Sequence, residues 1–551
     1  MKKYIVIAAI ALVGIASAFI ILGNEGYNPF TGDERVSYSE SKEIHLPMEK
    51  LRTLNPVTSK DADTYQISKL IFESLFTFDD TLTPVNQLAS SYVYDANKLT
   101  AEITIKNNSY FSDGTNVTAE DVKYSIENYM AAGNNSVYSS YVSNIKKVSL
   151  DKENNYKLTV KFKNGLNVSE DNFTFPIISK KNFGKHTAAK VLSPSFIPVG
   201  SGPYAIQSYN EISDLVLTAN EYYSGVKPEN TLVFDILPEK EDIIPLLDVS
   251  NMSMGIINDL SRDTLVADKN VSTQNIISNE VEVIGFNFRK EYMQNAKLRK
   301  AIAYSLDNES LLETAYYKNV VLCDSILYPG YLGTENKGEQ YKYDLDKAKE
   351  TFVSANYLDR NEDGYLDDVN EKTLELTILV NSQDLNRSLV AKSLKDNLDK
   401  LKIYSTIIYA DGAEEFSYKL AEAKYDIFIG GLKINEKYDL RKVLHTNYGN
   451  IIKYSNPKLD NIMDKMKSGV SLEKQKELVI DMKDILIEEL PYYPIGYKTY
   501  GALLSEAFCG NEKGYMFNNY YKNCMDWYCK YKIQENEENE QFEVVDSLEA
   551  L

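Results

Sequence analysis

The sequence predicts an α/β protein. Strand-like runs with alternating apolar residues recur along the chain, for example at Leu158–Phe162 and Leu215–Thr218. They alternate with helical patterns, which are clearest in the second half at Val390–Leu401 and Ser471–Leu490. The 551 residues are 43% hydrophobic and 25% charged, an ordinary globular composition. A chain of that length is long enough to form the hydrophobic cores of roughly three or four domains.

The N-terminus predicts export. Lys2 and Lys3 precede an uncharged run at residues 4–22, which as a helix would be about 28 Å long and would span a bilayer with little tilt. The lysines should stay cytoplasmic and place the remainder outside. An A-x-A pattern at residues 16–18 is a cleavage signal, yet the apolar run continues beyond it. We expect a signal anchor in residues 1–24, with a cleaved signal peptide as the alternative. The body is then held at the extracytoplasmic face of the cell membrane, or is secreted or in the cell wall if cleavage occurs.

Two polar segments flank the predicted folded body. Residues 25–44 have the composition of a tether between membrane and domain. Residues 534–551 carry seven acidic side chains and no Lys or Arg, which is typical of a disordered tail. The formal charge of the whole chain is −20, which argues against nucleic acid as a partner.

The cysteines leave several arrangements open. An even count in an oxidising compartment permits disulfides, and four cysteines allow three connectivities. Zinc is not expected, because no C-x-x-C pair occurs and the three histidines are isolated in the sequence. The first cysteine lies too far along the chain for an N-terminal lipid attachment. The four are Cys323, Cys509, Cys524 and Cys529.

Residues 109–126 are the most informative stretch. Asp113-Gly114 is a turn dipeptide that follows a predicted strand. Thr118 has the position of a helix N-cap, with Asp121 three residues later at the positive end of the helix dipole. The first buried face of this helix is predicted from Val122, Ser125 and Ile126.

The run F-S-D-G-x-x-x-T-A-E-D-V at residues 111–122 resembles the signature of family 5 extracellular solute-binding proteins, the peptide-capturing subunits of ABC importers. Further segments match that family in the same order, from about residue 45 to residue 533. They are Leu54-Asn55-Pro56, Ile71–Leu75, Leu88–Tyr92, Gly200–Tyr204, Asn220–Gly225, Leu298–Asp307 and Pro491–Pro494.

The resemblance implies a two-lobed periplasmic-binding-protein-like fold (type II, cluster C) with an extra subdomain on lobe one. Lobe one would comprise residues 45–285 plus 498–533, with the subdomain at 76–190. Lobe two would comprise residues 286–497. Ligand would be enclosed between the lobes by hinge closure.

The resemblance also implies a ligand site. Family members that bind peptides carry the motif G-W-x-A-D-x-x-D-P, whose first Asp holds the ligand's α-amine through a charge-assisted hydrogen bond. Here Gly431 and Asp439 match the ends, but the span is one residue longer. Counting forward places the amine-binding residue at Asn435, whereas counting back places it at Glu436, which we favour. An exposed loop at this point is the alternative. The other expected ligand-contacting residues are Leu432, Lys433 and Asn55.

A second pattern concerns metal. Asp359, Asn361, Asp363 and Asp367, with Gly364, resemble the first half of an EF-hand calcium loop, although position 12 is Asn370 rather than Glu. A solvated turn is the default interpretation, and we expect no cofactor and no other metal.

The sequence therefore predicts a monomeric binding protein that captures oligopeptides in an interlobe cleft and delivers them to ABC permease subunits, with its N-terminal segment in the cytoplasmic membrane. The alternative is a membrane-anchored receptor for a specific peptide signal or a non-peptide solute, without import. An enzyme is not expected, since the chain lacks G-x-S-x-G, H-E-x-x-H and P-loop motifs.

Overall fold

A computed structural model describes residues 37–533 apart from 185–187, 191, 194, 239–242 and 259–269. The predicted signal anchor at residues 1–24 and the predicted acidic tail at residues 534–551 lie outside the described residues.

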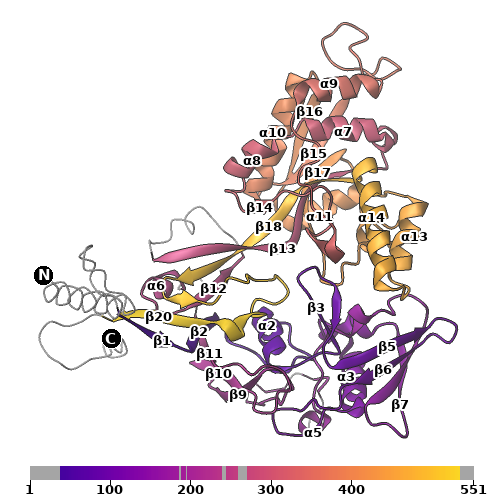
Figure 1. The fold of residues 1–551 in the computed structure, drawn as a ribbon. Coiled ribbons are helices and arrows are strands. Elements are labelled where there is room, and N and C mark those ends of the chain that lie inside the picture. Colours follow the sequence, from indigo (N-terminus) through magenta and orange to yellow (C-terminus); the bar gives the residue numbers. More distant parts are fainter. Residues whose placement is uncertain are drawn as a thin grey trace, which may run out of the picture.

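The chain forms two lobes connected by a pair of long antiparallel strands (Figure 1). These strands are β13 (Val271–Phe286) and β18 (Tyr492–Ser505). They lie inside a mixed sheet of order β12-β18-β13-β17-β15-β16, with β14 also paired to β18. One sheet therefore begins in the first lobe and ends in the second, so a bend or twist of β13 and β18 changes the angle between the lobes. The two-lobed α/β architecture agrees with the sequence-based prediction.

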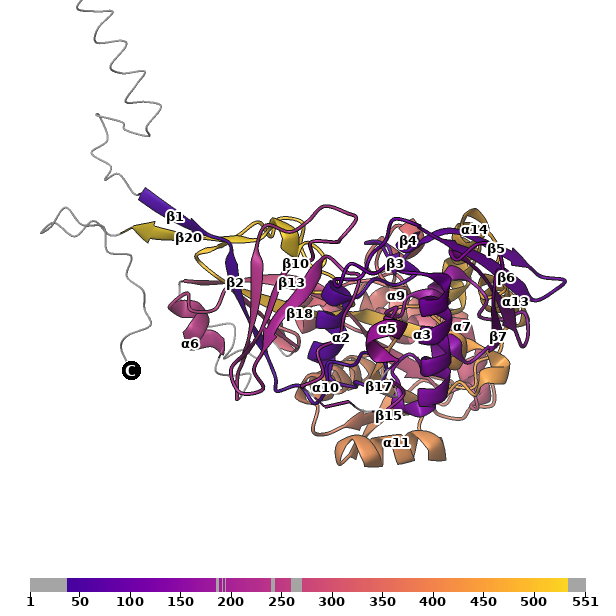
Figure 2. The ribbon, with the colours of Figure 1, turned by 90° about the horizontal axis from the view of Figure 1, so that it is seen from below.

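The body of lobe one contains two further sheets, of order β2-β11-β10-β9 and β1-β20-β19. β1 and β20 lie side by side where the described chain begins and ends (Figure 2). The elements are β1 (Ser37–Ser41), β2 (Glu43–Met48), α2 (Ala62–Ile71), β9 (Tyr204–Tyr209), β10 (Asp214–Ala219), β11 (Thr231–Ile236), α6 (Ile243–Asp248), β12 (Met254–Ile257), β19 (Phe508–Cys509) and β20 (Tyr528–Ile533).

The folded body begins earlier than the sequence suggested. Residues 37–44, which the prediction placed in the tether, are largely strand, because β1 pairs with β20 and β2 pairs in parallel with β11. The side chains of residues 38–40 are exposed at the edge of the molecule, which explains why this polar stretch resembles a linker in sequence.

The extra subdomain contains a four-stranded antiparallel sheet of order β5-β6-β8-β7, next to helix α3. Its elements are β3 (Phe76–Phe78), β4 (Pro84–Asn86), β5 (Ala89–Asp95), β6 (Thr100–Ile105), α3 (Ala119–Ala132), α4 (Ser139–Val142), β7 (Ile145–Leu150), β8 (Lys157–Phe162) and α5 (Lys180–Phe183).

The start of α3 is confirmed as predicted. Thr118 and Asp121 form a reciprocal capping box, in which the Thr118 backbone N–H donates to Asp121 Oδ2 at 3.0 Å. Gly114 has φ +78° in the preceding turn, a conformation that favours glycine. The predicted apolar face of the helix, Val122, Ser125 and Ile126, is fully buried.

Lobe two packs helices around the parallel strands β15, β16 and β17, and α13 and α14 lie against each other at its edge. The elements are α7 (Ala296–Tyr304), α8 (Asn308–Thr314), β14 (Val320–Val321), α9 (Leu345–Ser354), β15 (Glu375–Asn381), α10 (Leu385–Lys400), β16 (Tyr404–Ala410), α11 (Gly412–Glu422), β17 (Ile427–Lys433), α12 (Arg441–Leu444), α13 (Pro457–Met466) and α14 (Leu472–Glu489).

All four cysteines are free thiols in this structure. Cys323, Cys524 and Cys529 are buried and Cys509 is partly exposed. The disulfides that the even cysteine count permitted are therefore not formed here.

Candidate functional site

Glu436 lies where the two lobes meet. It follows β17 of lobe two, and its side chain is only 5% exposed. Two tyrosines of lobe one donate to its carboxylate, Tyr65 to Oε2 at 2.8 Å and Tyr141 to Oε1 at 2.9 Å. Burial next to Glu436 raises the pKa of both phenols well above its ordinary value, so both remain protonated donors. A carboxylate of one lobe is thus held by hydroxyl groups of the other.

Lys69 supplies the opposite charge. Tyr65 and Lys69 are four residues apart on α2, so their side chains project from the same face of the helix. Lys69 Nζ lies 3.4 Å from Glu436 Oε2 and 3.1 Å from the Tyr65 hydroxyl, and it also donates to the Asn518 carbonyl. Burial lowers the pKa of Lys69, and the Glu436 charge opposes that shift. The result is a buried ion pair that links the lobes.

Other charged groups cross the same boundary. Lys467 Nζ of lobe two lies 2.9 Å from Asp171 Oδ2 of the subdomain, and both side chains are less than 10% exposed. Lys437 Nζ donates to Asn172 Oδ1 at 3.0 Å and lies 4.1 Å from the centroid of the Tyr141 ring. Burial lowers the pKa of Lys437 to about 8. These contacts hold the lobes together in the conformation described here.

A pocket opens beside the Glu436–Lys69 pair. In this conformation its cavity volume is about 50 Å³, and its lining comes from lobe one apart from Glu436 of lobe two. The Asn518 Oδ1 atom is buried and has no hydrogen-bond partner within the described part of the chain. Apart from the ion pair, the polar groups that line the pocket are neutral: Ser74, Thr77, Gln87, Tyr138, Thr174, Asn518 and Asn519. Amides and hydroxyls of this kind can pair with peptide N–H and C=O groups.

The other predicted residues of the loop have different surroundings. Asn435 is exposed, whereas Asp439 accepts two hydrogen bonds from the Arg441 guanidinium, at 2.9 and 2.7 Å, and one from the Arg441 backbone N–H at 3.1 Å. Burial alone would raise the pKa of Asp439, but the bonds from Arg441 and the charge of Lys467 outweigh it and lower the pKa to about 2. Asp439 therefore orients Arg441, which donates to Asn167 of the subdomain at 2.6 Å.

Gly431, Leu432 and Lys433 form the end of β17 and pair with β13. A Cβ atom at Gly431 would collide with the ion pair between Arg387 and Glu280, so this glycine provides space for a cluster at the crossing strands. None of these three residues is in hydrogen-bond contact with Glu436 among the described interactions.

Asn55 lies in lobe one and is fully buried. Its amide donates to the carbonyls of Ala188 and Lys190, at 2.8 and 3.1 Å. In this conformation the side chain fixes a loop of the subdomain, and its role toward ligand stays a prediction.

The calcium-like loop is a turn closed by hydrogen bonds from its backbone to its own carboxylates; residues 359–363 are exposed, whereas Asp367 is fully buried. Asp359 accepts from the Gly364 N–H at 3.1 Å, and Asp367 accepts from the Arg360 N–H at 3.0 Å. Within the described residues, no group of three His, Cys, Asp or Glu side chains has the arrangement of a metal site. Calcium binding at this loop stays a prediction.

Sequence reasoning missed the lobe-one half of the site: Tyr65, Lys69, Tyr141, Asp171 and Asn172. The i, i+4 spacing of Tyr65 and Lys69 on one helix face was the available signal. No local sequence pattern relates Tyr65 or Lys69 to Glu436, because more than 360 positions separate Glu436 from each of them.

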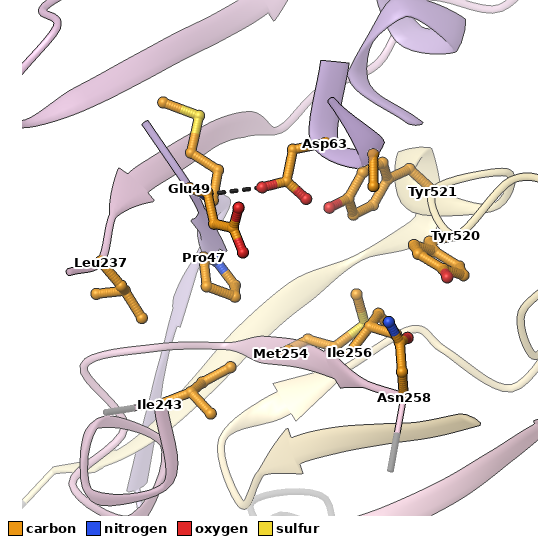
Figure 3. Close-up of a pocket in the computed structure, with 13 residues that line it drawn as sticks. Pro47, Glu49, Asp63, Leu237, Ile243, Met254, Ile256, Asn258, Tyr520 and Tyr521 are labelled. Carbon is orange, nitrogen blue, oxygen red and sulfur yellow. Dashed lines mark hydrogen bonds between the residues drawn. The ribbon is translucent and has the colours of Figure 1, made fainter. Parts of the chain in front are cut away.

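A second pocket lies within lobe one, between β2, β12 and the Tyr520–Tyr521 segment (Figure 3). Glu49 and Asp63 lie on one side, where the Glu49 N–H donates to Asp63 Oδ2 at 2.7 Å. It does not include Glu436 or Lys69, and we assign no ligand to it.

None of the helices within the described ranges has the length and apolar character that crossing a membrane requires.

Comparison with protein families matches residues 83–450 to the middle region of the bacterial extracellular solute-binding proteins, family 5. The oligopeptide-binding protein AppA of Bacillus subtilis is 23% identical over 488 residues, which cover 84% of this chain and 87% of that protein. The probable D,D-dipeptide-binding periplasmic protein DdpA of Escherichia coli is 24% identical over 491 residues, covering 85% and 90%.

Solved structures share the fold. A putative peptide binding protein AppA from Clostridium difficile superposes with a TM-score of 0.68 at 20% identity, covering 88% of this chain and all of the other. The unliganded open form of the murein tripeptide binding protein MppA gives a TM-score of 0.75 at 16% identity, covering 91% and 99%. With the family match extending over two thirds of its length, the chain belongs to family 5 of the bacterial extracellular solute-binding proteins.

Proposed function

We propose that this protein captures oligopeptides in the cleft between its lobes, outside the cell, and delivers them to the permease of an ABC importer. Two relatives carry peptide-binding names, an oligopeptide-binding protein and a probable D,D-dipeptide-binding protein. The AppA protein of Bacillus subtilis, with a TM-score of 0.57 and 19% identity, was solved in complex with a nonapeptide.

The observation that carries the proposal is the polar pocket between the lobes. Glu436 comes from lobe two, and Lys69, Asn518 and the hydroxyl-bearing side chains come from lobe one. A peptide backbone offers one donor and one acceptor per residue, and neutral amides and hydroxyls can pair with both. Such pairing does not depend on side-chain identity, so it suits a site that takes many sequences.

Binding would be reported by lobe closure. The Glu436, Lys437 and Lys467 contacts to lobe one exist only while the lobes are together. A ligand that touches both lobes has greater affinity for the closed state and shifts the population toward it. The permease would then recognise the closed form.

The remaining parts of the proposal follow from the family and from the sequence. The protein acts by binding and not by catalysis, it functions as a monomer, and its N-terminal segment anchors it to the cytoplasmic membrane. Glu436 is the proposed centre of the ligand site, with Asn435, Asp439, Gly431, Leu432, Lys433 and Asn55 in supporting positions.

Native mass spectrometry of the full-length protein, purified gently from a peptide-rich culture, tests the proposal. We expect a series of adducts with peptide masses that are released on activation. A single adduct of defined mass would favour a dedicated signal or a non-peptide solute. A protein that carries no adduct and also fails to bind added peptide pools would contradict peptide capture.

A further inference from the structure

The Glu436 carboxylate already has an ammonium partner within the protein. Lys69 Nζ lies 3.4 Å from Glu436 Oε2, and the side chains of Lys69 and Glu436 are 19% and 5% exposed. Tyr65 and Tyr141 occupy the same carboxylate, one on each oxygen. A ligand ammonium that approached Glu436 would meet a carboxylate whose charge is balanced and whose two oxygens are bonded.

Lys69 is fully engaged as well. Its ammonium group has three N–H donors, and its three partners are Glu436, the Tyr65 hydroxyl and the Asn518 carbonyl. A second ammonium in this pocket would therefore lie close to a buried cation, without a carboxylate of its own. Like charges in a poorly solvated site repel strongly, and a buried cation without a partner carries a large desolvation cost.

Lys437, the residue after Glu436, is a further cation of the interlobe network. Lys437 has no carboxylate within ion-pair distance among the described residues, and its hydrogen-bond partner across the lobes is the neutral Asn172. The charged side chains of the interlobe network are four cations, Lys69, Lys437, Arg441 and Lys467, and four carboxylates, Asp171, Glu436, Asp439 and Asp464, the last of which lies 3.9 Å from Arg441.

We propose that Lys69 makes this cleft select peptides whose N-terminal end is uncharged, such as N-acylated peptides, in place of peptides with a free α-amine. The neutral hydroxyls and amides that line the pocket can bond an acylated end that carries an N–H and a carbonyl. Lys69 and Glu436 are thereby specificity-determining residues. This inference depends on the peptide-binding function proposed above and names the peptide class.

The test compares two forms of one peptide pool. A lysine-free pool of tetra- to hexapeptides is used with free amino termini and after N-acetylation, so that only the terminal charge and the acetyl group differ. Competition binding to the full-length wild-type protein is measured by native mass spectrometry or calorimetry. The variants are Lys69→Met, which frees Glu436, and Lys123→Met as control, because Lys123 forms an exposed pair with Glu127 on α3, outside the described interlobe contacts.

We expect wild type and Lys123→Met to bind the acetylated pool at least as tightly as the free pool. Lys69→Met should shift the ratio at least tenfold toward free amines. A tenfold wild-type preference for free amines would overturn the inference and leave the proposed function standing. An unchanged ratio in a folded Lys69→Met protein would have the same two consequences. Binding of neither pool would overturn both. If Lys69→Met does not fold, the wild-type ratio decides, with Lys69→Gln as a second variant.

Discussion

At the scale of single residues, Glu436 is the side chain whose change should have the largest effect on the cleft. Replacing it by Gln keeps its size but leaves Lys69 as a buried cation without a counter-charge. We expect Glu436→Gln to lower the unfolding free energy by about 3–5 kcal/mol, the usual cost when a buried ion pair loses one partner. Peptide affinity should fall at least tenfold in the same variant. Chemical denaturation and calorimetry measure the two effects.

Asn435 provides the matched control for this variant, because it is the neighbouring candidate from the sequence and its side chain is exposed. Asn435→Ala should change stability by less than about 0.5 kcal/mol. If Asn435→Ala impaired binding while Glu436→Gln did not, the forward count of the motif would be correct and our assignment of Glu436 would be wrong.

Glu73 gives a pH-dependent prediction at the same scale. Its side chain is buried, and burial raises its pKa to about 7, a shift that the positive charge of Lys106 only partly offsets. Its folded-state pKa lies above the unfolded value of about 4.3, so the folded protein binds the extra proton between these pH values. Stability from this group is present at low pH and is lost as pH rises through about 7.

The unfolding free energy of wild type, relative to Glu73→Gln, should therefore fall by about 1–3 kcal/mol between pH 5 and pH 8. Urea unfolding of both proteins across that range measures the difference. Parallel curves for the two proteins would show that Glu73 is already ionised in the folded state at pH 5.

At the scale of elements, the end of β17 depends on the absence of a side chain at Gly431. A methyl group there would displace the Arg387–Glu280 ion pair, which also involves the fully buried Glu282 of β13. We expect Gly431→Ala to lower the unfolding free energy by about 1–3 kcal/mol, as for other overpacked sites. Gly165→Ala is the control, because a Cβ atom at Gly165 would meet only ordinary van der Waals contacts. Equal melting temperatures for the two variants would contradict this account.

The elements also show which features the sequence could predict. The capping box of α3 and the turn at Asp113-Gly114 were predictable because their chemistry is complete within a few residues. The strand at Ser37–Ser41 was not, because only its pairing with β20, almost 500 residues later, distinguishes it from a tether. The lobe-one partners of Glu436 were also not predictable, since they come from α2 and from the extra subdomain and meet Glu436 only in the folded chain. The motif spacing alone could not decide between Asn435 and Glu436, and the structure buries only the second.

At the scale of the whole molecule, the Lys467–Asp171 pair should help to determine how often the lobes are closed. Removing Lys467 would leave Asp171 buried without its cation in the closed form, at a cost of about 3–5 kcal/mol. Opening the lobes exposes Asp171 to water and relieves that cost. We therefore expect Lys467→Met to populate an open form with a larger radius of gyration in small-angle X-ray scattering without ligand.

Lys474→Met is the matched control for this change, since Lys474 pairs with Glu477 on the solvent-exposed side of α14. Its scattering curve should superpose on that of wild type. A Lys467→Met protein that also superposes on wild type would show that this pair does not control closure.

A crystal structure of the full-length protein, carrying the peptide that mass spectrometry identifies, would test the proposed ligand site most directly. We expect an extended peptide between the lobes, in the pocket beside Glu436, with the Lys69–Glu436 pair intact and an uncharged peptide end next to it. A peptide bound away from this pocket would show that Glu436 is not the centre of the ligand site, and a free α-amine that displaces Lys69 from Glu436 would show that the cleft selects charged peptide ends.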